Sequence, residues 1–282
     1  MSGTSQVALV TGCSTGIGRA TALALNARGV TTYASARRVE TLADLEDAGC
    51  RSLPLDVTDE AARVHAVETI ERELGRLDIL VNNAGYAQYG PVEEVPIERW
   101  RVEFETNVFG ALRLIQLSVP GMRERGYGRI VNMSSMGGEM ALPLGGPYHA
   151  SKFALEALSD ALRYEVRPFG IDVVLIQPGL VTSNYGKTAS DGLKESLDGP
   201  YGSMAARFIG TMATTYTKGA RGSASPEKVA KVVAHAATTR RPRTRYKITS
   251  LARLLPAARN WLPDRLWDAL LHRSFGRPDA PD

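Results

Sequence analysis

Short apolar runs alternate along the chain with longer segments in which apolar residues recur every three to four positions. The short runs are typical of buried strands, and the three-to-four spacing is typical of helices with one buried face. The predicted strands are Val7–Val10, Thr31–Ala36, Arg51–Leu55, Ile79–Val81, Ile130–Met133, Asp172–Ile176 and Tyr246–Ile248. The predicted helices are Ile17–Arg28, Thr41–Ala48, Glu60–Leu74, Ile97–Arg125 with an interruption at Pro120, Tyr148–Arg167 and Pro226–Thr238.

This alternation predicts an α/β fold, namely a single Rossmann-type, doubly wound parallel sheet with helices on both faces. In such sheets a ligand binds at the carboxyl ends of the strands. The chain has no internal repeat and no linker long enough to separate two domains. We therefore expect one dinucleotide-binding and catalytic domain over residues 1–249, with a substrate-lid region at 183–225, and a C-terminal amphipathic extension over 250–282.

Composition narrows the class of protein further. Hydrophobic residues make up 44% of the 282 residues and charged residues 23%, as in ordinary soluble globular proteins. The net charge is only +4 and no long basic run precedes Arg240, so nucleic-acid binding is not indicated. Two cysteines, Cys13 and Cys50, do not form a disulfide framework. Without a secretory signal, a membrane-spanning run or a metal-ligand cluster, the sequence predicts a cytoplasmic protein without a metal site.

A glycine-rich turn lies between the first predicted strand and the first predicted helix. Its glycines allow a tight turn and close approach to a pyrophosphate, and the helix N-terminus supplies free N–H groups. The spacing differs from the commoner Gly-x-Gly-x-x-Gly, so a plain strand-to-helix turn is the alternative. The predicted cofactor contacts here are Gly12, Ser14, Thr15, Gly16, Ile17 and Gly18.

The end of the second predicted strand bears on the choice of cofactor. An NAD enzyme usually has an acidic residue there, about 20 residues past the turn, to bind the ribose 2′-hydroxyl. This chain has Arg37 and Arg38 instead, and no acid. Guanidinium groups pair well with a phosphate, so NADP(H) is the predicted cofactor, although both arginines could simply be solvated surface charges.

Candidate acid–base groups occur near the ends of later strands. Tyr148 and Lys152 are four residues apart in a predicted helix and so lie on one face. A nearby cation favours the phenolate, which makes a tyrosine more useful as a proton donor and acceptor near pH 7. Ser135 follows the strand that ends at Met133, and Asn107 lies inside a long predicted helix. Two hydroxyl groups that converge on a carbonyl oxygen would suit hydride transfer.

Taken in order, these motifs resemble those of the classical short-chain dehydrogenase/reductase family. The resemblance runs from about Val7 to Ser183 and is carried by Thr11–Gly18, Asp56-Val57, Asn82–Gly85, Asn107, Ser135, Tyr148 with Lys152, and Pro178-Gly179. It departs from the family at Ser183, where threonine is frequent, and at Thr15, where NADP-dependent members often have a basic residue. Cofactor choice therefore depends on Arg37 and Arg38.

The resemblance implies a role for each matched position. Tyr148 would be the general acid/base, Lys152 would hold the nicotinamide ribose and tune Tyr148, and Ser135 would hydrogen-bond the substrate oxygen. Asn107 would hold a water in a proton relay. The remaining implied cofactor contacts are Asp56, Val57, Asn83, Ala84, Gly85, Pro178, Gly179, Val181 and Ser183.

The substrate is expected to be bound by the region after the last motif. Apolar residues between Tyr201 and Tyr216 have helical spacing, which fits a helix packed on the core, a lid over an apolar substrate, or both. The predicted substrate contacts are Met140, Leu142, Tyr185, Met204 and Phe208. A hydrophobic alcohol or ketone, steroid- or retinoid-like, is the corresponding hypothesis.

The predicted function is an NADP(H)-dependent alcohol dehydrogenase or ketoreductase. The alternatives are a non-catalytic NADP(H) sensor and an enzyme that isomerises or dehydrates a bound intermediate. The family resemblance also implies a homodimer or homotetramer. In the extension after Arg240, basic residues adjoin apolar, tryptophan-bearing segments, which more often cap a core or a subunit contact than bind a membrane surface.

Overall fold

The computed structural model describes residues 5–182, 191–215 and 222–279. Seven parallel strands form one sheet in the order β3-β2-β1-β4-β5-β6-β7. The strand order reverses between β1 and β4, which is where a doubly wound sheet opens a crevice for a ligand. The strands are β1 (Val7–Val10), β2 (Thr31–Ala36), β3 (Arg51–Pro54), β4 (Ile79–Asn82), β5 (Gly128–Met133), β6 (Ile171–Pro178) and β7 (Arg245–Ile248).

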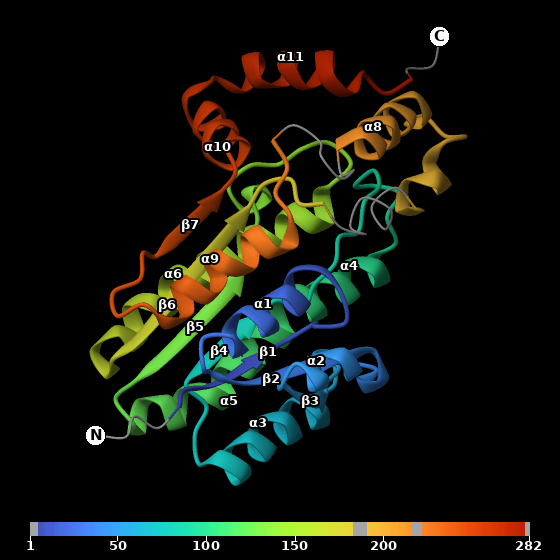
Figure 1. The fold of residues 1–282 in the computed structure, drawn as a ribbon. Coiled ribbons are helices and arrows are strands. Elements are labelled where there is room, and N and C mark those ends of the chain that lie inside the picture. The colour runs from blue at the N-terminus through green and yellow to red at the C-terminus, as the bar shows by residue number, and fades with distance from the viewer. Residues whose placement is uncertain (1–4, 183–190, 216–221, 280–282) are drawn as a thin grey trace.

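Helices cover both faces of the sheet (Figure 1). Successive side chains of β1 point to opposite faces, so Ala8 and Val10 join one apolar cluster while Val7 and Leu9 join the other. The α-helices are α1 (Gly16–Asn26), α2 (Ala43–Asp47), α3 (Glu60–Leu74), α4 (Ile97–Phe104), α5 (Gly110–Glu124), α6 (Gly146–Val166), α8 (Gly202–Thr215), α9 (Pro226–Thr238), α10 (Leu251–Trp261) and α11 (Asp264–Phe275). The first cluster includes side chains of α1 and α9, and the second includes those of α3, α5 and α6. The predicted doubly wound fold is confirmed.

The long helical region between β4 and β5 is interrupted at a different place from the one predicted. Pro120 lies inside α5, which continues to Glu124. Pro120 has no N–H, so the backbone carbonyl of Gln116 loses its helical hydrogen bond. Both residues are exposed, and water can bond to that carbonyl instead. The interruption lies instead at a π-helical segment, Glu105–Phe109, between α4 and α5. Such single-turn segments are often found at functional sites.

Of the two C-terminal helices, α10 and α11, the second packs against α8, the helix predicted from the apolar spacing after Tyr201. The rings of Phe208 and Phe275 stack with their centroids 5.5 Å apart. Beyond α11, the carboxylate of Asp279 accepts a hydrogen bond from the backbone N–H of Ser203 at 3.1 Å. The backbone N–H of Asp279 donates to the carbonyl of Pro200 at 2.7 Å. The segment that follows α11 therefore fastens the beginning of α8.

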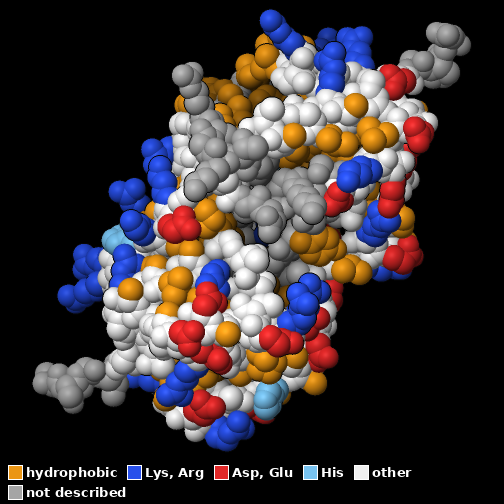
Figure 2. All heavy atoms as spheres, turned by 45° about the vertical axis from the view of Figure 1, so that its right-hand side comes forward, with side chains coloured by type: hydrophobic (Ala, Val, Ile, Leu, Met, Phe, Trp, Pro, Cys, Tyr) orange, Lys and Arg blue, Asp and Glu red, His pale blue; other side chains and the backbone are white. Residues whose placement is uncertain are grey.

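The same two helices leave apolar side chains exposed. Trp267 is buried, whereas Leu254, Trp261 and Leu266 are exposed. Figure 1 places α10 and α11 at the top of the molecule. In Figure 2, hydrophobic and basic side chains lie close together at the same height. Among the described helices, none combines the length and apolar character needed to cross a bilayer.

Candidate active site

The glycine-rich turn after β1 forms a cradle beside the carboxyl end of the sheet. Gly12 and Gly16 have φ of 71° and 62°, a left-handed conformation that glycine adopts without strain. A Cβ on Gly18 would lie 2.3 Å from the carbonyl oxygen of Gly12 and 2.4 Å from the side-chain nitrogen of Asn83. The turn and α1 thus approach each other so closely that only glycine fits.

The side chain of Asn83 holds the backbone of this turn in place. Its side-chain amide donates to the carbonyls of Thr11 at 2.8 Å and Gly12 at 3.2 Å. The hydroxyl of Thr11 accepts in return from the backbone N–H groups of Asn83 and Ala84. Asn83 was predicted to contact the cofactor, and its amide is used to fix the backbone of the turn.

The N-terminus of α1 is open to an anion. Thr15, its N-cap, makes no side-chain capping bond, and the first turn contains no acidic residue. The unpaired N–H groups and the positive end of the helix dipole favour a phosphate at this position. The residues present therefore fit the pyrophosphate of a dinucleotide.

The second strand leads to the two candidate 2′-phosphate ligands. Arg37 and Arg38 follow β2 directly and are exposed. Among the described residues, neither guanidinium has a hydrogen-bond or ion-pair partner, and both remain available to an anion.

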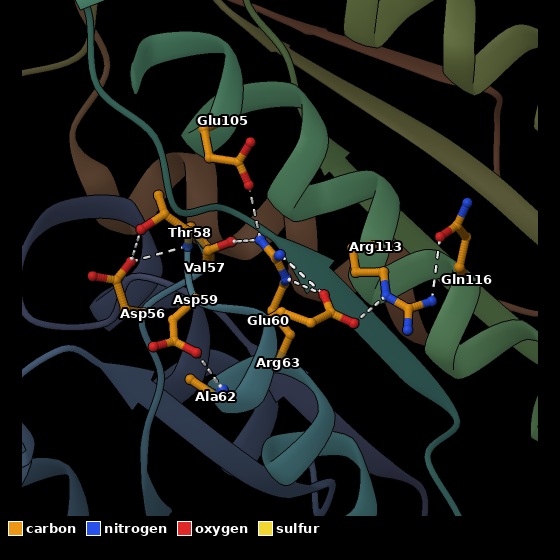
Figure 3. Close-up of polar contacts among 10 residues, drawn as sticks. All are labelled: Asp56, Val57, Thr58, Asp59, Glu60, Ala62, Arg63, Glu105, Arg113 and Gln116. Carbon is orange, nitrogen blue, oxygen red and sulfur yellow. Dashed lines mark hydrogen bonds and ion pairs between the residues drawn. The ribbon is translucent and has the colours of Figure 1, made fainter. Parts of the chain in front are cut away.

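A polar network holds the loop after β3, which carries Asp56 and Val57 (Figure 3). Asp56 accepts two hydrogen bonds from Thr58, which shapes the loop locally. Arg63, buried on α3, donates to the carbonyl of Val57 at 2.5 Å and to Glu105 of the π-helical segment at 3.1 Å. The predicted adenine end of the site is thereby tied to the segment that carries Asn107.

Tyr148 and Lys152 share the first turns of α6, as predicted. The Lys152 nitrogen lies 5.8 Å from the centroid of the Tyr148 ring and donates to the carbonyl of Met133, at the end of β5, at 2.9 Å. Burial lowers the pKa of Lys152 to about 8, although negative charges on Glu103 and Glu156 oppose the shift. A titratable cation is therefore held against a phenol that is only 8% exposed.

Ser135 and Asn107 complete the predicted catalytic set. Ser135 follows β5, and its hydroxyl accepts a hydrogen bond from the backbone N–H of Gly137 at 3.0 Å. Asn107 lies in the π-helical segment and is 2% exposed. Its amide nitrogen contacts the carbonyl of Tyr86 at 2.9 Å and the hydroxyl of Ser151 at 3.0 Å, and its oxygen accepts from the N–H of Tyr86 at 3.1 Å. Tyr86 and Ser151 thus fix both ends of the amide.

Two predicted cofactor contacts lie at the end of β6. Pro178 ends the strand, and the N–H of Gly179 donates to the carbonyl of Ile248 at 3.0 Å. Val181 is buried and pairs with Ala224 in an isolated bridge. Ser183 and Tyr185 lie outside the described residues.

Tyr148 belongs to a buried apolar cluster. Met204 and Phe208 of α8, which were predicted to contact the substrate, belong to it. Met140 and Leu142 do not, and Leu144 takes their place, because its left-handed φ of 63° turns the chain back at this point. Met140 instead lines a hollow with Phe153 of α6 and Leu262. The buried cluster consists of Ala87, Tyr89, Leu144, Tyr148, Leu193, Met204, Ala205, Phe208 and Met212.

Two neighbours of the site were missed from the sequence. Tyr89 stacks near Tyr148, with ring centroids 6.1 Å apart, and contacts Phe208. Glu103 is fully buried on α4, one turn before Asn107. In the sequence, only its spacing of four residues from Asn107 indicated that Glu103 lies near the site. Acidic residues on helices are usually solvated, so burial was not expected. Among the described residues, no group of three or more His, Cys, Asp or Glu side chains could hold a metal ion.

Comparison with known proteins identifies the family. Residues 6–194 match the short chain dehydrogenase family. The chain is 36% identical to a 3-ketodihydrosphingosine reductase of Bacteroides thetaiotaomicron, over 93% of this chain and 94% of the relative. It is 34% identical to an NADPH-dependent 3-dehydrocapnine reductase of Ornithobacterium rhinotracheale, over 95% and 96%.

Solved structures show the same fold. A short-chain dehydrogenase from Streptomyces avermitilis superposes with a TM-score of 0.80 at 35% identity, covering 95% of this chain and 96% of that one. A metagenomic short-chain oxidoreductase in complex with NADP (TM-score 0.67, 27% identity, 86% and 97% coverage) and an NAD+-bound xylitol dehydrogenase (0.72, 28%, 86% and 97%) are also similar. The chain belongs to the short-chain dehydrogenase family of oxidoreductases.

Proposed function

We propose that this protein is an NADP(H)-dependent oxidoreductase that transfers a hydride between the nicotinamide and a hydrophobic alcohol or ketone, with Tyr148 as the general acid/base. The observation that carries the proposal is the position of the Tyr148 ring. It lies 5.8 Å from the Lys152 nitrogen and belongs to an apolar cluster that includes two residues of α8, Met204 and Phe208. A proton donor in that position serves a carbonyl group whose substituents are apolar.

Each polar residue of the site then has a defined task. The nicotinamide supplies or accepts the hydride. Tyr148 gives its phenolic proton to the developing alkoxide during reduction, and Ser135 donates a second hydrogen bond to the same oxygen. The positive charge of Lys152 stabilises the phenolate that remains. Asn107 fixes the π-helical segment beside these groups. It also binds a water molecule that takes part in proton transfer.

The substrate class follows from the apolar cluster and from the two relatives named above. Both relatives are named for reduction at a 3-keto or 3-dehydro position. We infer that this chain reduces a ketone with a long aliphatic substituent that lies against Met204, Phe208 and Leu144, a narrower class than the hydrophobic ketones expected from the sequence. Small polar ketones would gain no apolar contact from these side chains.

A series of methyl ketones of increasing chain length would test this substrate class. Each methylene buried against the cluster contributes about 0.8 kcal/mol, so kcat/KM is expected to rise about three- to fourfold per methylene until the cluster is filled. Steady-state rates of NADPH oxidation measure this. A flat or falling series would contradict an apolar substrate site, and turnover of hydroxylated ketones at equal rates would do the same.

The cofactor preference depends on Arg37 and Arg38, and the 2′-phosphate distinguishes NADPH from NADH. Replacing Arg37 with alanine is expected to weaken NADPH binding at least about tenfold and to leave NADH binding within about twofold, because one charge-assisted pair is lost. Fluorescence titration of both nucleotides measures this. Arg28→Ala, at an exposed position after α1, is the matched control. Equal loss of both nucleotides would contradict the assignment of NADP(H).

The alternative of a non-catalytic sensor is not favoured, because the relatives are oxidoreductases and a sensor would not need the proposed proton donor. We also propose that the protein acts in the cytoplasm as a homodimer or homotetramer. Exposed aromatic side chains on the π-helical segment and α6, such as Phe109 and Phe153, offer apolar surface for subunit contacts.

A further inference from the structure

A buried carboxylate lies next to the catalytic residues and has no role in the reaction described so far. Glu103 of α4 has no exposed surface. Within the described parts of the chain, no lysine or arginine forms an ion pair with it. Burying a carboxylate without a paired cation is costly, so its presence calls for a specific set of partners.

Those partners connect Glu103 to Asn107. One carboxylate oxygen accepts from the backbone N–H of Gln88 at 3.1 Å, and the other accepts from the side-chain nitrogen of Asn107 at 3.1 Å. An ionised carboxylate only accepts hydrogen bonds, so it requires the nitrogen of the Asn107 amide to face it. The amide oxygen then faces the N–H of Tyr86, with which it bonds.

The charge of Glu103 also bears on Lys152 of α6. Burial raises the pKa of Glu103 to about 8, and the bond from Gln88, the charge of Lys152 and the bond from Asn107 each oppose that rise. Glu103 in turn favours the protonated form of Lys152. The other ionisable groups that face this pair are Tyr148 on α6, Tyr86 in the segment before α4, and Glu156 on α6, which is tied to Gln177 and Arg245.

We propose that Glu103 is a positioning residue for the oxidoreductase reaction: its carboxyl group orients the Asn107 amide and, when ionised, supplies a buried negative charge that holds the proton on Lys152. This proposal rests on the proposed function, because it assigns Glu103 a part in the proton transfer of that reaction. Glu103 acts through its neighbours and does not itself touch the substrate.

Glu103→Gln tests the proposal, because it keeps the size of the side chain and removes the charge. Glu103 is ionised above about pH 8, and loss of that negative charge favours loss of a proton from Lys152. In the proposed reaction the charge of Lys152 stabilises the Tyr148 phenolate, so the high-pH limb of kcat/KM should move to lower pH by about one unit. The pH profile is measured with NADPH and 3-ketodihydrosphingosine. Glu98→Gln on the same helix, with a 71% exposed side chain, should leave the profile unchanged.

A second measurement does not need turnover. Because the pKa of Glu103 is raised above its ordinary value of 4.5, its protonated form stabilises the fold fully at low pH, and that stability is lost as the pH rises through about 8. Glu103→Gln does not undergo this loss. The melting temperature of Glu103→Gln relative to wild type should therefore rise between pH 5 and pH 8, whereas that of Glu98→Gln should not.

The outcomes separate the two proposals. If the wild type reduces no ketone, the proposed function fails, and the melting curves still report whether Glu103 is a buried, titrating carboxylate. Suppose that the wild type is active, that Glu103→Gln has the same pH profile of kcat/KM as wild type, and that its melting temperature relative to wild type does not change with pH. The role proposed for Glu103 is then wrong. If only the melting difference changes, Glu103 is structural and the positioning role is also wrong.

Discussion

Replacing Tyr148 with phenylalanine is expected to lower kcat/KM for ketone reduction by about 10³-fold or more. The ring stays in its apolar cluster, so packing is retained, and only the proton donor is lost. A positioned general acid typically contributes about 10² to 10⁴ in rate, and Ser135 alone would leave one donor at the developing alkoxide. Single-turnover measurement of NADPH oxidation gives this effect directly, and a fluorescence titration should show nearly unchanged NADPH affinity.

Tyr89→Phe provides the matched control for this variant. Tyr89 is buried in the same cluster, with its ring 6.1 Å from that of Tyr148, so the same chemical change is made in the same surroundings. We expect its kcat/KM to stay within about tenfold of wild type, since the loss of a hydrogen bond costs about 0.5–1.5 kcal/mol. Activity of Tyr148→Phe at the level of Tyr89→Phe would remove Tyr148 from the mechanism.

The second large effect is expected for Gly18→Ala. A methyl group there would lie 2.3 Å from the carbonyl oxygen of Gly12, so the turn must move away from α1. Overpacking of this kind costs about 1–3 kcal/mol, and the displaced turn should bind NADPH at least about tenfold more weakly. Thermal unfolding and nucleotide titration measure the two effects.

Gly210→Ala is the corresponding control. Gly210 also lies within a helix, and a methyl group at that position would meet nothing within 4 Å. Alanine is the better helix former by about 1 kcal/mol, so this variant should be as stable as wild type or more stable. A Gly18→Ala protein that binds NADPH as the wild type does would show that the turn is not the pyrophosphate site.

The central strands could be predicted from sequence because they are short and buried, with a continuous apolar run in Val7–Val10 and β-branched and aromatic residues in Thr31–Ala36. Thr31–Ala36 and Val7–Val10 have the predicted bounds. The glycine-rich turn was recognisable for a related reason: glycines between a buried strand and a helix have few other uses. These features are local, so a window of a few residues is sufficient to identify them.

Features that depend on distant contacts could not be predicted. The π-helical segment differs from an α-helix by one hydrogen-bond register, which hydrophobic spacing does not reveal. Glu103 resembles Glu98 and Glu105 in the sequence, and only the packing of α4 near Gln88 and α6 shows that it is buried. Leu144 replaces Met140 in the cluster because of a left-handed backbone conformation that is uncommon for leucine.

The support of the glycine-rich turn has a consequence for the order in which the protein folds. The backbone N–H of Thr11 donates to the carbonyl of Val81, and the Asn83 amide that holds the turn is 72 residues away along the chain. Contacts between such distant residues form only after a large loop has closed, which slows folding. The turn therefore reaches its final shape only after β4 has docked beside β1. Nucleotide binding during refolding would thus report a late event, the completion of the centre of the sheet.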